Sequence, residues 1–465
     1  MSIHGMPDLF ISTSSRDGGT VNWLNDIFLK AVQMGTSDIH FEDMEETTRV
    51  RFRINGALQT AETISRMQAV DAMNKLRSRA NLPLSETRKP LDGRLSLFYA
   101  VENVSIDVRV SFSPIIYGYS VVCRILDQRN TLRTVDDILM TPEVRDWINI
   151  LLHEPNGLFL VTGPTGSGKT STLYAMINAL RNDTTKITTI EDPVEYRVAG
   201  LCQTNIEGTL TFSQVLRAEL RQDPDVILVG EIRDAETATI ALQAAMTGHL
   251  VLSTLHTNDA AATIGRMLDL GVDPNTLGAA LRGVLAQRLV RKLAPSHGWA
   301  KASEAEKFWL KNHGIDAPDA DYGVPNRGEA DGGYEGRVPV MELIIIDRLI
   351  RNTLPLKDVK LIRAAAKRQP QYQSLAAHAA SLARQGVTSL DEAFTVSGRA
   401  EHLRSLNSLP DRLVEMGKLT PYQHDICKRI QQEASERGER LAFENVVIAQ
   451  RYVSQEDLDE MADAL

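Results

Sequence analysis

The sequence predicts an α/β fold built on a mostly parallel β-sheet, and two observations carry this prediction. Apolar runs alternate with stretches of helical periodicity in the middle of the chain, at residues 158–161, 186–190, 226–230 and 250–255. Each intervening helix implies a crossover connection, which makes the neighbouring strands parallel. Polar residues or a glycine-rich loop follow every run, so we expect a ligand site at the edge where the carboxyl ends of these strands meet.

An α+β domain is expected ahead of this sheet, over residues 21–128. After a polar lead-in at residues 1–20, apolar spacing predicts a helix over 21–35, and Asn55-Gly56 marks a hairpin turn between two strand-like runs. Arginines on these runs could present guanidinium groups to a phosphate or could line a solvated strand face. They are Arg49, Arg51, Arg53, Arg94, Arg109 and Arg124.

A linker with one helix, TPEVRDWINILLH, is expected over residues 129–156. Helical periodicity then returns between the apolar runs, near residues 170–181, 212–221 and 234–247. These stretches are the crossover helices that the parallel sheet requires.

The first apolar run ends in a glycine-rich loop, GPTGSGKT, which a helical stretch follows. This context matches the pattern G-x-x-x-x-G-K-[ST], in which glycines let backbone N–H groups turn toward phosphate oxygens. We expect Lys169 to reach the β- and γ-phosphates and the Thr170 hydroxyl to bind Mg²⁺. The predicted nucleotide-contacting residues of the loop are Gly163, Pro164, Thr165, Gly166, Ser167, Gly168, Lys169, Thr170 and Ser171.

Acidic residues follow the second and third apolar runs. Glu231 ends a buried strand and would face the γ-phosphate, where it can orient the attacking water or accept its proton. Glu191, Asp192 and Glu195 form an acidic group suited to hydrated Mg²⁺, which needs only one or two carboxylates. Helix capping would explain any one of these residues, but not the convergence of several clusters on one phosphate loop.

Two histidines and two arginines complete the set of candidates. His249 and His256 are each weak signals, because a lone histidine is more often a core or cap residue, but His256 falls at the predicted edge. A zinc site formed by this pair is not expected, because no cysteine lies near it. Arg217 and Arg221 share one helix face, where they could contact phosphate, pair with a neighbouring subunit's carboxylate or face solvent.

Composition narrows the function classes. The 465 residues carry a net charge of −9, with 43% hydrophobic and 24% charged residues, as in ordinary globular proteins. An acidic chain argues against a nucleic-acid motor, whose footprint is usually basic. We expect no membrane span and no signal peptide, because no apolar stretch is long enough. The isolated cysteines favour a reducing compartment.

The sequence resembles the ATPases that power type II secretion and type IV pilus machines. Four segments match their Walker A, Asp-box, Walker B and His-box motifs: GPTGSGKT, TTIEDPVEY, LRQDPDVILVGEIRD and TGHLVLSTLHTNDAA. Further matches are SDIHFED, VRFRING, LDGRL, GYEGRVPVMELI and GVTSLDEAF, so the resemblance covers roughly residues 20–397. It implies a RecA-like core over 157–397, a PAS-like N-terminal domain and a hexameric ring.

The resemblance also implies roles for residues already singled out. Glu231 corresponds to the hydrolytic carboxylate, and Glu195 matches the functional glutamate of the Asp box. His249 and His256 match the two His-box histidines. The N-terminal arginines that would contact nucleotide are Arg94, Arg109 and Arg124.

The chain departs from many assembly-type members, which carry a four-cysteine zinc knuckle. The corresponding positions hold Ala294, His297, Asn326 and Glu329, so no zinc site is expected. Residues 300–330 are instead expected to form a surface insertion with one short helix near 303–313. Because retraction ATPases also lack the knuckle, its absence weakens the choice of assembly or secretion over retraction.

Residues 398–465 lie beyond the motor and show a repeated helical pattern, with a stop and a restart at Gly417 and Thr420. They resemble the small helical domains of assembly ATPases that dock on membrane partners. In some relatives such a domain binds a cyclic dinucleotide through an Arg-Leu-Gly opening, which Ser408-Leu409-Pro410 replaces here. A partner-docking domain is therefore favoured over nucleotide sensing, with a simple C-terminal cap as the alternative.

Together these features predict a cytoplasmic, Mg²⁺-dependent ATP hydrolase, peripheral at the inner membrane. As a homo-hexamer it would drive a platform protein of a pilus or secretion machine, without binding nucleic acid. Three alternatives stay open: a retraction ATPase of the same family, a RecA-like nucleic-acid motor, and a ring that binds nucleotide only as an assembly switch.

Overall fold

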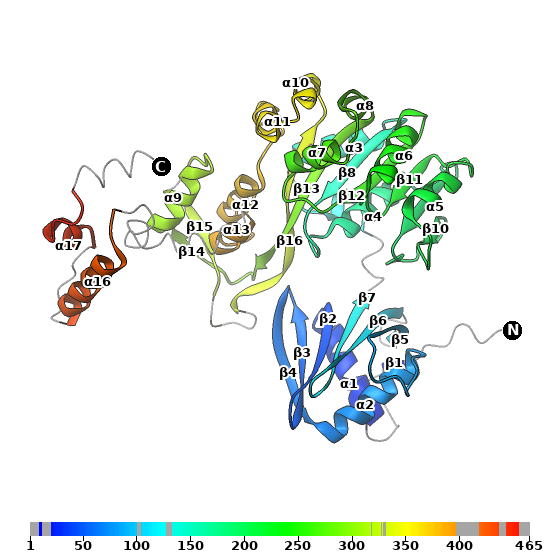
Figure 1. Ribbon diagram of the computed structural model, residues 1–465, viewed down its shortest axis with the longest axis horizontal. Helices are drawn as coiled ribbons and strands as arrows, with labels where there is room; N and C mark the ends of the chain where they lie inside the picture. The colour runs from blue at the N-terminus through cyan, green and yellow to red at the C-terminus, as the bar shows by residue number, and fades with distance from the viewer. Residues whose placement is uncertain are drawn as a thin grey trace. The chain divides into compact units, whose positions relative to one another are not determined.

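The computed structural model describes residues 9–11, 20–99, 104–126, 133–317, 319–326, 328, 332–396, 418–436 and 443–454. Within these residues the chain forms two seven-stranded sheets and one two-stranded sheet, together with helices whose order Figure 1 shows. The chain divides into two compact units, residues 1–287 with 343–372, and residues 288–342 with 373–465. The predicted fold class, α/β around a largely parallel sheet, is confirmed.

The N-terminal part of the first unit is a sheet with strand order β1-β5-β6-β7-β2-β3-β4 and two helices. Its pairs are antiparallel except that of β1 with β5. The elements are β1 (Leu9–Ile11), α1 (Thr20–Gln33), β2 (Asp38–Asp43), β3 (Thr47–Ile54), β4 (Ala57–Ser65), α2 (Arg66–Arg79), β5 (Leu91–Tyr99), β6 (Val104–Ile115) and β7 (Gly118–Leu126).

One face of this N-terminal sheet is apolar and the other is polar. Burial alternates along β3, as a half-buried strand requires, and Phe28 of α1 packs with Phe41 and Phe52 in the core. The predicted hairpin turn lies between β3 and β4, where Asn55 and Gly56 both adopt positive φ. The polar face carries the arginines singled out from the sequence.

The second sheet is central to the nucleotide-binding region, and its strand order is β10-β9-β11-β12-β8-β13-β16. The four strands predicted from the sequence are consecutive neighbours, and all three of their pairs are parallel. Strands β10 and β13 also pair in parallel with β9 and β8. The strands are β8 (Gly157–Thr162), β9 (Ile187–Glu191), β10 (Cys202–Asn205), β11 (Val226–Val229), β12 (Leu250–Leu255), β13 (Leu281–Leu293) and β16 (Tyr334–Ile345).

Helices cover this sheet, so every residue of β8, β9, β11 and β12 is buried. Helices α4 and α6 pack against β8 and β12 (Figure 1). Helix α5 packs against β9. The helices of this region are α3 (Pro142–Leu152), α4 (Lys169–Leu180), α5 (Phe212–Glu219), α6 (Ala235–Met246), α7 (Ala260–Asp269), α8 (Pro274–Ala280), α10 (Arg348–Thr353) and α11 (Val359–Ala366). Short 3₁₀ helices among the described residues of this region are η2 (Val135–Asp137) and η4 (Leu354–Leu356).

The second unit contains residues 294–329, the segment in which many relatives carry a zinc knuckle and in which none is expected here. Up to residue 396 its elements are β14 (Gly298–Lys301), α9 (Glu304–Asn312), β15 (Asp321–Val324), α12 (Leu375–Arg384) and α13 (Leu390–Val396), besides parts of β13 and β16. Trp309 and Tyr322 are 1% exposed, and the Trp309 ring lies 5.0 Å from that of Phe394. Aromatic packing therefore holds this stretch together.

The C-terminal residues that the structure describes form α16 (Pro421–Glu436) and α17 (Phe443–Ala449). Thr420 caps α16, because its hydroxyl accepts a hydrogen bond from the Gln423 backbone N–H at 3.3 Å. The two helices share a small apolar core that includes Leu419, Cys427 and Val447. Gly417 and residues 408–410, which the sequence singled out, lie outside the described residues.

No helix within the described ranges is both long and apolar enough to cross a lipid bilayer.

Candidate functional site

The glycine loop between β8 and α4 has the backbone geometry of a phosphate cradle. Gly163, Gly166 and Gly168 have φ values of +149°, +78° and +87°, which side chains with a Cβ rarely adopt. A Cβ at Gly163 would also collide with the backbone oxygen of Gln287. Helix α4 begins immediately after the loop, so its free N–H groups and positive dipole end lie at the cradle.

Lys169 lies in the first turn of α4 and folds back over the loop. Its Nζ donates to the carbonyl oxygens of Gly163 and Pro164, at 2.8 and 3.0 Å, and the residue is only 9% exposed. The neighbouring Ser167 hydroxyl is buried and has no hydrogen-bond partner among the described residues. A buried, unpaired hydroxyl in this loop fits a cradle that accommodates phosphate oxygens.

Gln287 of β13 holds this loop in place. The sequence analysis did not predict this role for Gln287. Its Nε2 donates to the Ser167 carbonyl at 2.8 Å, and its Oε1 accepts from the Thr172 hydroxyl at 2.7 Å. The residue is 2% exposed, and the amide spans the loop and the first turns of α4. Only a strand that was not predicted brings this glutamine to the loop, so spacing along the chain carried no signal for it.

A cavity of about 230 Å³ opens at the carboxyl edge of the central sheet. Thr165, Gly166, Lys169 and Thr170 line it from the loop. From the neighbouring strand ends come Glu191, Asp192, Gly230, Glu231, Thr254 and His256, and Glu195 follows in the loop after β9. The structure thus brings the loop, the predicted carboxylates and one predicted histidine to a single cavity.

Glu231 lies between two cationic or potentially cationic side chains. One carboxylate oxygen forms an ion pair with Arg233, and the other lies 3.4 Å from Nε2 of His256. Arg233 also reaches Asp192, with 3.5 Å between Nη1 and Oδ2. Sequence analysis missed Arg233, although it stands two residues after Glu231 and extended backbone places such residues on the same side.

Glu191 is held differently from Glu231. Its carboxylate accepts hydrogen bonds from the Tyr174 hydroxyl, at 2.8 and 3.0 Å, and from the Thr189 hydroxyl at 2.6 Å. Burial raises the pKa of Glu191, and the nearby Glu195 carboxylate raises it further, while these hydroxyl donors act in the opposite sense. Glu191 therefore faces a buried tyrosine as well as the cavity.

Thr170 is the residue best suited to a magnesium ion. Its hydroxyl lines the cavity and makes no hydrogen bond within the described part of the chain, so it is available as a hard oxygen ligand. Among the described residues, no group of three or more histidine, cysteine, aspartate or glutamate side chains comes together as a metal site. A hydrated magnesium ion needs only one or two carboxylates, and Asp192 and Glu195 line the same cavity as Thr170.

The three N-terminal arginines lie side by side on the polar face of their sheet. Arg94 is the cross-strand partner of Arg109, which in turn pairs with Arg124. Together with Pro193 they line a cavity of about 410 Å³. Burial lowers the pKa of Arg109, with neighbouring arginines acting in the same sense and Glu195 opposing them.

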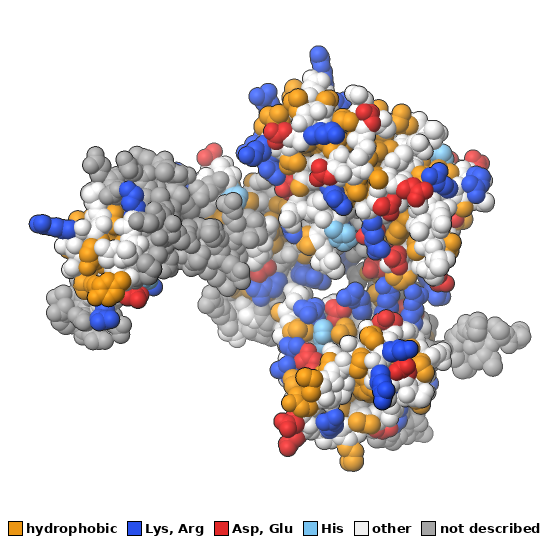
Figure 2. Space-filling model, viewed as in Figure 1, with side chains coloured by type: hydrophobic (Ala, Val, Ile, Leu, Met, Phe, Trp, Pro, Cys, Tyr) orange, Lys and Arg blue, Asp and Glu red, His pale blue; other side chains and the backbone are white. Residues whose placement is uncertain are grey.

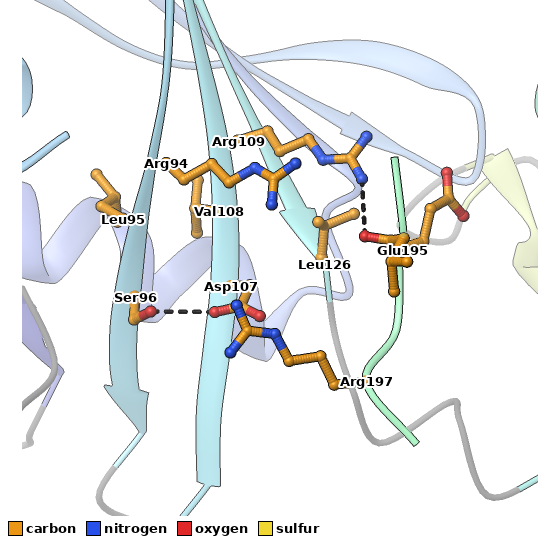
Figure 3. A pocket seen from close by; sticks show the side chains of 10 residues that line it. Arg94, Leu95, Ser96, Asp107, Val108, Arg109, Leu126, Glu195 and Arg197 are labelled. Carbon is orange, nitrogen blue, oxygen red and sulfur yellow. Dashed lines mark hydrogen bonds between the residues drawn. The ribbon is translucent and has the colours of Figure 1, made fainter. Parts of the chain in front are cut away.

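The segment after β9 connects the two cavities. Nη2 of Arg109 donates to the Val194 carbonyl at 3.3 Å, and Figure 3 shows Arg94 and Arg109 extending in the same direction toward this segment. Pro193 lines both the phosphate-loop cavity and the arginine cavity. Glu195 lines the phosphate-loop cavity and a smaller pocket that includes Arg94, Arg109 and Arg197.

Several predicted residues do not lie at the cavity in this chain. His249 precedes β12, so it lies at the opposite edge of the sheet, where its Nδ1 is 3.1 Å from the Ala244 carbonyl. Arg217 pairs with Glu236 at 3.1 Å, and both side chains are more than half exposed. Arg221 donates to the Arg217 carbonyl. The predicted loop residues that do not line the cavity are Gly163, Pro164, Ser167, Gly168 and Ser171.

A parallel sheet whose carboxyl edge carries a phosphate loop, a strand-end glutamate and a threonine on the first helical turn defines a nucleotide-binding α/β protein. The comparison with protein families is more specific. Residues 14–395 match the family model described as "Type II/IV secretion system protein", and the chain belongs to this family.

Curated relatives and solved structures agree with this assignment. The type II secretion system ATPase E of Vibrio cholerae is 38% identical over 396 residues, covering 83% of this chain and 76% of the relative. The type II secretion system protein E of Pseudomonas aeruginosa is 42% identical over 344 residues, covering 73% and 68%.

The crystal structure of the pilus retraction motor PilT with bound ADP matches with a TM-score of 0.56 at 27% identity, covering 82% of this chain and 98% of PilT. The ATPase DotB of Legionella pneumophila matches with a TM-score of 0.62 at 21% identity, covering 84% and 98%, which concerns the fold alone.

Proposed function

We propose that this protein is a Mg²⁺-dependent ATP hydrolase that powers a type II secretion or type IV pilus-assembly machine. The observation that carries the proposal is the convergence of Lys169, Thr170, Glu231 and His256 on one cavity at the carboxyl edge of the sheet. Hydrolysis of a phosphoanhydride needs a phosphate cradle, neutralising charge and a positioned water. The residues lining this cavity offer each of these.

Each group has a role that follows from its chemistry. The loop N–H groups and the Lys169 ammonium bind phosphate oxygens and neutralise their charge. Glu231 orients the attacking water or accepts its proton, and Arg233 and His256 hold the Glu231 carboxylate in place. Thr170 binds Mg²⁺, with Asp192 and Glu195 available to its water shell. When bound, the ion stabilises negative charge on the phosphates.

Arginines from the N-terminal sheet complete the neutralisation in this proposal. Arg94, Arg109 and Arg124 face one cavity whose wall includes Pro193, and Pro193 also lines the phosphate-loop cavity. Closure of the N-terminal part over bound nucleotide would bring guanidinium groups to the phosphates. The domain movement that follows hydrolysis would then deliver force to an inner-membrane platform protein.

A homo-hexameric ring is the expected assembly, as the family resemblance implies. Helix α5 ends at Glu219, so only Arg217 of the predicted pair lies on it and Arg221 follows in the turn. Both are exposed and could reach a neighbouring protomer's nucleotide or carboxylate. His249, far from the cavity of its own chain, is likewise proposed to act only if the ring places it near a second site. The cytoplasmic face of the inner membrane is the proposed location.

Pilus retraction is the second candidate, and the likeness to PilT favours it. Secretion or assembly is preferred because the curated relatives at 38–42% identity are type II secretion proteins. A nucleic-acid motor has less support. Figure 2 shows Lys and Arg side chains interspersed with Asp and Glu over the region that holds α5 to α8 on the visible face, rather than a continuous basic surface.

Phosphate release by the purified chain, with and without Mg²⁺, tests the proposal. Wild type should release phosphate only with the ion, and Lys169→Ala should abolish nucleotide binding or turnover. Native mass spectrometry with a non-hydrolysable ATP analogue should show six copies. Nucleotide binding without phosphate release would contradict the enzymatic role and leave the assembly switch, whereas stimulation by DNA or RNA would favour the nucleic-acid motor.

A further inference from the structure

A row of charged side chains crosses five strands of the N-terminal sheet. The cross-strand partners are Arg94 with Arg109, Arg109 with Arg124, Arg124 with Asp38, and Asp38 with Arg53. Directly paired residues point to the same face, with Cβ atoms about 5 Å apart. The row therefore places four guanidinium groups on one face, with the Asp38 carboxylate between the third and the fourth.

Asp38 is almost fully buried, at 6% exposure, and both of its oxygens are engaged. Oδ1 accepts a hydrogen bond from Nε of Arg124 at 2.9 Å. Oδ2 accepts from the Ser37 hydroxyl at 2.8 Å and lies 3.9 Å from Nε of Arg53. The Ser37 hydroxyl and the two arginines thus hold the carboxylate in one orientation, with Arg124 on one side and Arg53 on the other.

The way in which Arg124 binds Asp38 leaves its outer nitrogens available. Contact is made through Nε, and the two terminal nitrogens make no hydrogen bond within the residues that the structure describes. The Arg124 side chain is 54% exposed and lines the arginine cavity. A guanidinium anchored through Nε keeps both NH₂ groups for a bidentate contact with an anion such as phosphate.

We propose that Asp38 is a positioning residue for Arg124: it fixes the side chain through Nε so that the outer NH₂ groups meet the polyphosphate of the nucleotide. The proposal rests on the proposed function. Like charges on adjacent strands repel, so without Asp38 the guanidinium of Arg124 would lie between those of Arg109 and Arg53 with no carboxylate beside it. Its orientation would then be lost even though Arg124 itself remains.

Glu42 provides a matched control four residues along the same strand. It lies on the same face and also pairs with two arginines, Arg49 and Arg51. Neither arginine lines the arginine cavity. Glu42→Gln therefore removes two ion pairs, as Asp38→Asn does. It leaves Arg94, Arg109 and Arg124 in place.

The test compares Asp38→Asn, Arg124→Ala, the double variant and Glu42→Gln in the full chain. The affinity for a fluorescent ATP analogue and the kcat/KM of ATP hydrolysis are both measured. We expect Asp38→Asn to weaken both by about tenfold, the loss typical of removing support from a functional side chain. The double variant should lose no more than Arg124→Ala, because Asp38 acts through Arg124. Glu42→Gln should stay within about twofold of wild type.

Additive losses in the double variant, or equal losses in Asp38→Asn and Glu42→Gln, would overturn the inference and leave Asp38 a structural residue. Ser37→Ala removes only the hydroxyl that donates to Asp38, so it gives a smaller loss in the same direction should Asp38→Asn fail to fold. The affinity for the fluorescent ATP analogue tests the role of Asp38 independently of ATP turnover. A wild type that binds the analogue but releases no phosphate would count against the proposed function alone.

Discussion

Asp225 and His249 lie at the amino ends of β11 and β12, and Glu231 and His256 lie at the carboxyl ends of the same strands. At the amino edge each side chain contacts a backbone group. Asp225 accepts from the Lys186 backbone N–H at 2.7 Å, and His249 contacts a carbonyl of α6. At the carboxyl edge, Glu231 and His256 instead lie against each other across the strands, 3.4 Å apart.

The difference follows from the direction of the chain. The helices of a parallel sheet begin near its carboxyl edge, so free N–H groups and the glycine loop gather there, and side chains after each strand face a common cavity. A six-residue strand separates the two edges by about 20 Å. Residue type alone therefore does not indicate function in this sheet, whereas position along the strand does.

Glu231 and Asp225 provide the largest expected contrast. Glu231→Gln keeps the size of the side chain but cannot accept a proton, so kcat should fall by about 10²- to 10⁴-fold while ATP still binds. Asp225→Asn makes the same chemical change at the other end of β11 and should leave kcat within about twofold. Steady-state phosphate release checks both variants. If hydrolysis survives in Glu231→Gln, that carboxylate is not the one that handles the water.

The two histidines provide the next contrast. His256→Ala removes the imidazole beside Glu231, and kcat should fall by about tenfold, as expected when a supporting group is lost. His249→Ala should change kcat little but lower the free energy of unfolding by about 1 kcal/mol, because a hydrogen bond to α6 is lost. Phosphate release and urea unfolding measure these effects. A comparable kinetic loss for His249→Ala would support the role that the family resemblance assigns to it.

Gln287 tests whether the loop at the carboxyl edge depends on a neighbouring strand. Gln287→Leu leaves the buried Ser167 carbonyl without its donor, so the free energy of unfolding should fall by about 1–3 kcal/mol and ATP affinity should drop with it. Gln385→Leu, at an exposed position after α12, is the control. Isothermal titration with ATP and urea unfolding measure the two effects. Unchanged affinity would show that the loop keeps its shape without Gln287.

Glu191 gives the smallest expected effect, and it depends on pH. Its pKa is raised by burial, so its carboxyl group favours the protonated form in the folded state. The stability it contributes is present below the ordinary carboxyl pKa and is lost as pH rises through the raised value. Glu191→Gln should therefore unfold at about the same temperature as wild type at low pH, and about 2–4 °C higher near neutrality. Glu236→Gln, an exposed carboxylate, should show no such divergence in thermal unfolding.

Much of the candidate site could be predicted because its residues follow predicted strands directly. Lys169, Glu231 and His256 come within one to seven residues of a strand end, so the parallel order of β9, β11, β12 and β8 was enough to place them together. Arg233 could have been found by the same reasoning, since it lies two residues after Glu231. Gln287 could not, because β13 has no apolar run as clear as the other four.

The sequence by itself determined the local geometry of this protein: a phosphate loop between a strand and a helix, a hairpin at Asn55-Gly56, and parallel strands with polar ends. These features follow from backbone freedom, capping and periodicity, which act over a few residues. Only the tertiary structure decided which distant groups meet. Arg124 donates a hydrogen bond to Asp38, which is 86 residues away along the chain. The Ser167 carbonyl accepts a hydrogen bond from Gln287, which is 120 residues away. Such pairs depend on strand order and register, which chain spacing does not encode.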